Sequence, residues 1–133
     1  MSITVMQLTS QEISDYRDQL AECESAMMAL DIIEDAEGNL EDGATSIALA
    51  IGQTPDRVDW LEGWAKRCRV AICQENLRSD LEDNYIETAV NYLLQKKICP
   101  PLLVIPVIIY VIKQGVNQFC EPLSYQLGVK NEK

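Results

Sequence analysis

The chain has 133 residues, with 21 acidic and 11 basic side chains, so its formal net charge is −10 at pH 7. It contains no histidine, which excludes catalysis by an imidazole base and any zinc site that needs a histidine ligand. Apolar residues make up 47% of the sequence, which is close to ordinary globular usage. We therefore expect one folded domain over residues 1–133, with a surface too acidic to favour nucleic acid.

The five cysteines favour free thiols over a disulfide framework or a metal site. Their number is odd, no two have the Cys-x-x-Cys spacing, and the N-terminal sequence MSITVMQLTSQE lacks the features of a secretion signal. We expect a cytoplasmic protein with reduced thiols and with no cofactor. The cysteines are Cys23, Cys68, Cys73, Cys99 and Cys120.

The first helix is expected after an N-terminal extension of residues 1–8. Thr9 and Glu12 have the spacing of a capping box, which marks a helix start. Apolar positions then recur at intervals of three and four residues, which predicts one amphipathic helix of five or more turns. Gly38-Asn39 is its expected end, because glycine tolerates the left-handed conformation that ends helices. The apolar positions are Ile13, Tyr16, Leu20, Cys23, Met27 and Leu30.

Two further helices are expected in the middle of the chain. A short apolar stripe ends at Gly52, and it consists of Leu40, Ala44, Ile47, Ala48 and Ile51. Thr54-Pro55-Asp56 then predicts a new helix, because threonine caps and proline suits the first helical position. The inward stripe of this third helix is Leu61, Trp64, Ala65, Cys68, Ala71 and Ile72.

The C-terminal half predicts two more helices. Ser79 and Glu82 repeat the capping-box spacing, and we expect that helix to end near Lys96-Lys97. The uncharged run 98–112 is rich in β-branched residues and reads as strand by propensity, but an otherwise helical chain leaves it almost no pairing partner. We prefer a helix from near Pro101 or Pro106 to about Cys120, ended by Glu121-Pro122 and followed by a frayed tail at 128–133.

The predicted fold is therefore all-α: a compact bundle of about five helices, with a proline-kinked, apolar C-terminal helix at its centre. The apolar run is shorter than the roughly 18 residues of a membrane span, and it contains Pro106. This favours burial in the core. The alternative, peripheral membrane association through residues 102–112, would leave that segment exposed.

Acidic pairs are the plentiful catalytic material of the sequence. Glu34 and Glu37, followed by Asp56 and Asp59, superficially resemble the pairs with which all-α nucleotide pyrophosphohydrolases hold magnesium against a polyphosphate. The same spacing recurs elsewhere in this acidic chain, so we favour a solvated helix face and no metal. A magnesium-dependent enzyme of that kind is an alternative, and it needs these four carboxylates to converge on one cavity.

Candidate interaction residues lie on and after the third predicted helix. Trp60 and Trp64 are one helical turn apart, with Trp64 on the inward stripe and Trp60 off it, so Trp60 is the candidate anchor. The basic side chains nearby either bind an anion or another protein's acids, or form a solvated face that pairs with local glutamates. They are Lys66, Arg67, Arg69 and Arg78.

The charge is uneven along the chain, which favours association. Residues 1–62 carry 14 acids against two arginines, a net of −12, whereas residues 63–133 have a net of +2. Basic partners, or the basic face of a second copy, suit such a surface. We therefore expect a small, non-enzymatic, acidic helical protein that acts by protein–protein association as an adaptor, regulator or oligomerisation module, and that forms a homo-oligomer.

Overall fold

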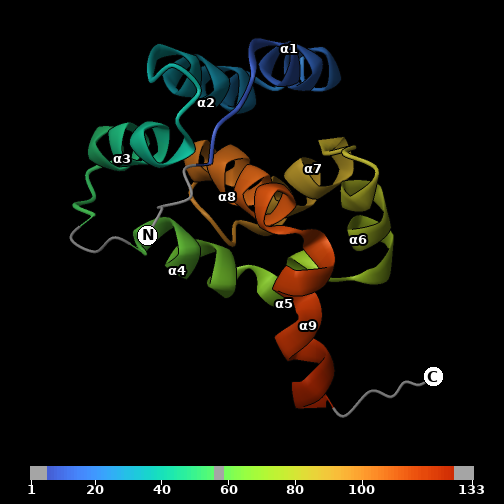
Figure 1. The fold of residues 1–133 in the computed structure, drawn as a ribbon. Helices are drawn as coiled ribbons and strands as arrows, with labels where there is room; N and C mark the ends of the chain where they lie inside the picture. Colours follow the sequence, from blue (N-terminus) through green and yellow to red (C-terminus); the bar gives the residue numbers. More distant parts are fainter. Residues whose placement is uncertain (1–5, 56–58, 128–133) are drawn as a thin grey trace, which may run out of the picture.

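The computed structural model describes residues 6–55 and 59–127, with side chains as far as Leu123. These residues form nine helices, and the only extended pairing among them is an isolated bridge between Gln7 and Asn39 (Figure 1). The all-α class is confirmed. The predicted count of about five is too low, because four of the predicted helices are each divided in two. In chain order the helices are α1 (Ser10–Gln19), α2 (Glu24–Asp35), α3 (Leu40–Ala50), α4 (Trp60–Arg67), α5 (Arg69–Ile72), α6 (Glu75–Glu82), α7 (Glu87–Lys96), α8 (Pro101–Gln114) and α9 (Val116–Leu127).

The capping box that starts α1 is confirmed, but the long first helix is not. Arg17 in α1 pairs with Asp31 in α2 at 2.8 Å and with Glu34 at 2.6 Å. In one continuous helix, Arg17 and Asp31 would be separated by about 21 Å along the axis. The chain therefore turns back after Leu20, and α1 and α2 form a helical hairpin.

Contacts from distant parts of the chain hold this turn. The Gln19 side chain accepts a hydrogen bond from the Ile86 N–H at 2.8 Å and donates one to the Asn84 carbonyl at 3.1 Å. The buried Tyr16 hydroxyl donates to Asn84 Oδ1 at 2.6 Å. Burial raises the pKa of Tyr16 to about 12, so this donor keeps its proton at neutral pH. The end of α1 is thus fixed by the α6–α7 turn.

Left-handed residues end several helices. The predicted stops at Gly38 and Gly52 are confirmed, with φ of +83° and +82°. After α2, the N–H of Glu37 donates to the Glu34 carbonyl and that of Gly38 donates to the Ile33 carbonyl, which is a Schellman motif. Glu37 itself has φ +59°, a conformation that costs a non-glycine residue energy.

Two predicted helix starts are wrong. Pro55 is not helical and α4 begins at Trp60, although residues 56–58 lie outside the described residues. Ser79 lies inside α6, which begins at Glu75, so its capping-box spacing marks no start. The break between α6 and α7 lies instead at Asn84, whose φ is +64°. The predicted end near Lys96 is confirmed by the end of α7.

The apolar run forms α8, which starts at Pro101 and continues through Pro106 to Gln114. It packs against α2, α3, α4 and α7, and residues 103–109 and Val111 are buried (Figure 1). The segment is a core helix and not a strand, and its burial is the opposite of what the peripheral membrane alternative requires. Among the described residues, no single helix is long and apolar enough to cross a bilayer. α8 and the start of α9 reach the necessary length and apolar composition when they are taken together as a bent pair.

The sharp bend of this region lies at Gly115 and not at Pro106. Gly115 has φ +108°, and the axes of α8 and α9 differ by 96°. α9 then runs through Pro122 to Leu127, so the predicted end at Glu121-Pro122 is wrong. The expected frayed tail at 128–133 lies outside the described residues.

The expectation of five reduced cysteines is also wrong. Cys73, which follows α5, and Cys120 in α9 form a disulfide, with their Cα atoms 5.8 Å apart. The two residues are 47 positions apart in sequence, and only the packing of α5 against α9 brings them within disulfide distance. Cys23, Cys68 and Cys99 are free thiols.

Candidate functional site

The three described carboxylates of the acidic pairs have separate places in the fold. Glu34 is engaged in the ion pair with Arg17, Glu37 lies in the turn after α2, and Asp59 occupies the N-cap position of α4. Asp56 lies outside the described residues. In the described part of the chain, no group of three histidine, cysteine, aspartate or glutamate side chains is placed to hold a metal ion.

The basic residues are spread over three helices and each has a contact within the chain. Lys66 pairs with Glu62 at 3.2 Å, which is the local pairing that a solvated face predicts. The Arg69 guanidinium lies 4.7 Å from the Phe119 ring centroid, and Arg78 donates two hydrogen bonds to Asn117 Oδ1 at 2.9 and 3.3 Å. They therefore form no single anion site.

α4 has two distinct faces, and its outer face gathers the aromatic candidates. The inner face is apolar and buried, and α4 packs against α8. Four residues at successive intervals of three, one and three residues lie together on the other side of the helix. They are Trp60, Gly63, Trp64 and Arg67. We call these four residues the α4 outer face. Both tryptophans are half-buried, so Trp64 is less enclosed than a core position.

A surface hollow of about 280 Å³ lies along the α4 outer face and is bounded at one end by Asp59. Gly63 creates part of this space, because a Cβ atom built there would have nothing within 4 Å. The Arg67 guanidinium lies over the Trp64 ring, 4.3 Å from its centroid, which is a cation–π distance. The face therefore combines two indole rings, one cation and an open space between them.

Charge is balanced on this helix, in contrast to the chain as a whole. Positions 59–67 carry two acids and two bases, whereas the chain has a net charge of −10. The bases are Lys66 and Arg67, and the acids are Asp59 and Glu62. Two copies of this protein, each with a net charge of −10, repel each other overall, and α4 is a region where the charge is locally balanced.

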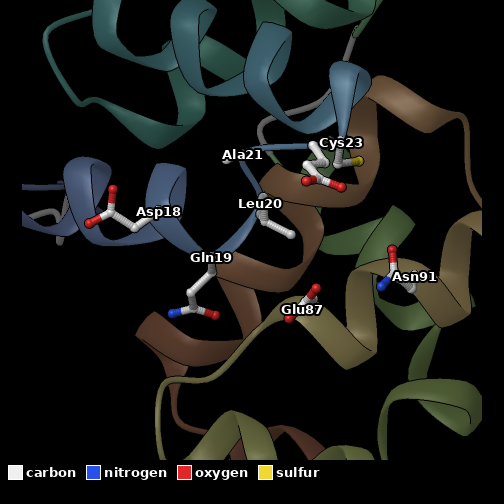
Figure 2. Close-up of a pocket in the computed structure, with 8 residues that line it drawn as sticks. Asp18, Gln19, Leu20, Ala21, Cys23, Glu87 and Asn91 are labelled. Atoms are coloured by element: carbon white, nitrogen blue, oxygen red, sulfur yellow. The ribbon is translucent and has the colours of Figure 1, made fainter.

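A second hollow, of about 520 Å³, was not foreseen from the sequence. Figure 2 shows Asp18 and Gln19 of α1, the turn to Cys23, and Glu87 and Asn91 of α7 around it. Asp18, Glu22 and Glu87 make its lining acidic, and Glu87 accepts a hydrogen bond from the Tyr85 hydroxyl at 2.8 Å. No sequence pattern signals this hollow, because it exists only where the unpredicted α1–α2 turn meets the start of α7.

Exposed apolar side chains do not form one patch in the described part of the chain. Those exposed by 42 to 70% lie on four different elements, and scattered apolar residues are normal on a protein surface. They are Met28 on α2, Leu49 on α3, Val70 on α5 and Tyr85 in the α6–α7 turn. The α4 outer face is thus distinguished by its shape and residue types and not by exposed area.

Comparison with models of protein families, with curated proteins and with solved structures gave no match for this chain.

Proposed function

We propose that this protein acts by association with a second copy of itself, through the α4 outer face. The observation that carries the proposal is the self-complementary order of that face: aromatic, glycine, aromatic, cation. A dimer with two-fold symmetry uses the same patch on both copies, so each projection on the patch must meet a hollow or a matching group on the same patch. The α4 outer face supplies both.

We place the two α4 helices antiparallel, with the two-fold axis between Gly63 and Trp64. Each of the four positions of one α4 outer face then meets one of the four positions of the other copy. Gly63 then faces the partner's Trp64, so the indole enters the space that the missing side chain leaves. Trp60 faces the partner's Arg67. That guanidinium has one side on Trp64 of its own chain, and its other side stacks on the partner's Trp60.

The chemistry of these residues suits an interface centre. Tryptophan and arginine are enriched among the residues that contribute most to binding, and they act best in hollows that exclude water. The balanced charge of positions 59–67 lets two acidic molecules approach there. The role of this module, as adaptor or regulator in the cytoplasm, extends the same proposal. No observation in the structure favours the magnesium enzyme or the membrane alternative.

Sedimentation equilibrium of the full chain and of a pair of neighbouring variants tests the proposal. Arg67→Gln and Lys66→Gln each remove one positive charge, from adjacent positions on α4. We expect the wild type to dimerise, Arg67→Gln to weaken the dimer about tenfold, and Lys66→Gln to leave it unchanged, because Lys66 is outside the α4 outer face. A wild type that sediments as a monomer, or equal effects of the two variants, would contradict the proposal.

A double-mutant cycle locates the contact. If Trp60 stacks on the partner's Arg67, then Trp60→Leu and Arg67→Gln remove the same interaction and their effects on the dimer do not add. In one chain these positions are about 10 Å apart along the helix, so a coupling in dimer affinity arises between the copies. Additive effects would place the contact elsewhere. Circular dichroism of each variant separates loss of association from loss of fold.

A further inference from the structure

α9 packs against α8, α5 and α6, and its buried residues in the described part of the helix lie near its start. Val116, Phe119 and Cys120 are buried, Asn117 accepts hydrogen bonds from Arg78, and the Phe119 ring contacts the Arg69 guanidinium. Glu121 and Pro122 are exposed, and Figure 1 shows the helix extending away from the other helices. The Cys73–Cys120 disulfide adds a covalent link to these contacts.

Gly115 gives α9 a point about which to turn. Its φ of +108° is accessible to glycine and strained for other residues, and it produces the 96° bend between α8 and α9. A Cβ atom at this position would have only the Gln118 Cβ, at 3.9 Å, near it. The backbone there is therefore uncrowded, and a change in the Gly115 torsions reorients the whole of α9.

The two cysteines of the disulfide differ in burial. Cys120 is fully buried, whereas Cys73 is half-buried and lines a surface hollow of about 390 Å³. The charged side chains around this hollow are Glu75, Arg78 and Glu82. The hollow is the route by which a thiolate from outside would approach Cys73, and among the described residues that line it Arg78 is the one positive charge, beside the two glutamates.

We propose that the Cys73–Cys120 disulfide is a thiol–disulfide exchange site, at which a dithiol protein of the thioredoxin class releases α9. The first thiolate of the dithiol attacks Cys73 Sγ, the S–S bond breaks, and its electron pair leaves with Cys120 Sγ, which takes up a proton. The second thiol of the dithiol then attacks the mixed disulfide, and Cys73 leaves as a thiolate that is protonated. The dithiol becomes a disulfide, and two electrons and two protons reach this chain.

Reduction removes the covalent link and leaves α9 held by noncovalent contacts, among them those of Val116, Asn117 and Phe119. Turning about Gly115 then uncovers Phe119 and the surfaces of α5 and α6 that α9 covers. Disulfides that meet a reducing compartment are typically transient or redox-sensing, which is the behaviour that such a latch requires. The inference does not depend on the α4 outer face.

A trapping experiment identifies the attacked sulfur. The oxidised full chain is mixed with a thioredoxin variant that lacks its resolving cysteine, so that the mixed disulfide accumulates, and the linked peptides are mapped by mass spectrometry. We expect the link at Cys73. A link at Cys120, or no trapped species under native conditions although denatured protein is trapped, would overturn the proposal.

Hydrogen exchange tests the release of α9. After reduction by wild-type thioredoxin, we expect amides of residues 116–127 to exchange at least about tenfold faster while those of α8 keep their protection. The Cys120→Ser variant should show the same fast exchange without any reductant, and Cys23→Ser, which removes a free thiol on the α1–α2 side, should behave as wild type. Unchanged exchange at 116–127 in both the reduced protein and Cys120→Ser would refute the latch.

Discussion

Adding one methyl group at Gly43 should strain the contact between α2 and α3, while the same change at Gly63 should stabilise the fold. Both glycines lie inside helices, Gly43 in α3 and Gly63 in α4. Replacing a helical glycine by alanine gains about 1 kcal/mol, because alanine loses less backbone freedom on folding. That gain is common to the two variants, so their difference isolates the packing at Gly43 when unfolding is measured at protein concentrations at which the chain is monomeric.

The surroundings of the two glycines set the magnitude. A Cβ atom at Gly43 would lie 2.8 Å from Ile33 Cγ1 and 3.1 Å from Ile33 Cα, which belongs to the backbone of α2. The side chain can turn away, but the backbone contact forces the two helices apart, and overpacking of this kind costs about 1 to 3 kcal/mol. At Gly63 a Cβ meets nothing within 4 Å.

Thermal or urea unfolding of the two variants and the wild type measures these changes. We expect Gly63→Ala to gain about 0.5 to 1 kcal/mol and Gly43→Ala to fall below it by about 1 to 3 kcal/mol. For a chain of this size, 1 kcal/mol corresponds to roughly 3 to 5 °C in Tm. Equal stabilities of the two variants would refute the close approach of α2 and α3 at Gly43.

Three further predictions concern stability. Glu37→Gly should stabilise the protein by about 0.5 to 1 kcal/mol in urea unfolding, because glycine relieves the strain of φ +59° at this position; a loss of stability would argue against the Schellman turn. Burial raises the pKa of Glu12, but the hydrogen bonds from Lys113 and Thr9 and the Lys113 charge together lower it by more than burial raises it. The pKa of Glu12 therefore lies below its usual value of 4.5. The pairing of Glu12 with Lys113 therefore stabilises the fold above about pH 4.5, and this stabilisation is lost as the pH falls through the lowered pKa. Lys113→Gln should make the free energy of unfolding fall less steeply with decreasing pH in the acid range. An unchanged acid dependence would contradict the pairing. Ile108→Asp should abolish folding, because it places an unpaired charge in the buried centre of α8, and a folded variant with native circular dichroism would refute that position.

Periodicity and capping signals were enough to predict the helical class and several helix ends. Thr9 with Glu12, Gly38, Gly52 and Pro101 act through local backbone geometry, which the sequence encodes within a few residues. The burial of most of the run 98–112 followed from its composition. These features depend on neighbours in sequence and needed no knowledge of tertiary contacts.

The breaks within helices could not be predicted, because tertiary contacts decide them. Nothing in the residues around Leu20 forbids a continuing helix, and the turn there depends on Gln19 contacting Asn84 and Ile86, which are more than 60 positions away. Ser79 and Glu82 have the capping spacing by chance within α6. The Asn84 break has a weak local signal, since asparagine tolerates positive φ.

The candidate surfaces show the same division. The tryptophans of α4 were visible as an aromatic pair, but the separation of Trp60, Gly63, Trp64 and Arg67 from the buried face depends on how α4 packs against α8. The acidic hollow and the Cys73–Cys120 bond join segments far apart in sequence. A charge count and a cysteine count contain no information about such pairings.

The central claim, association through the α4 outer face, is tested most directly by the dimer affinity of Gly63→Ala in sedimentation equilibrium. The account predicts a protein more stable than the wild type whose dimer is nevertheless at least about tenfold weaker, because the added methyl group fills the space that the partner's Trp64 enters. A Gly63→Ala protein that dimerises as tightly as the wild type would contradict it.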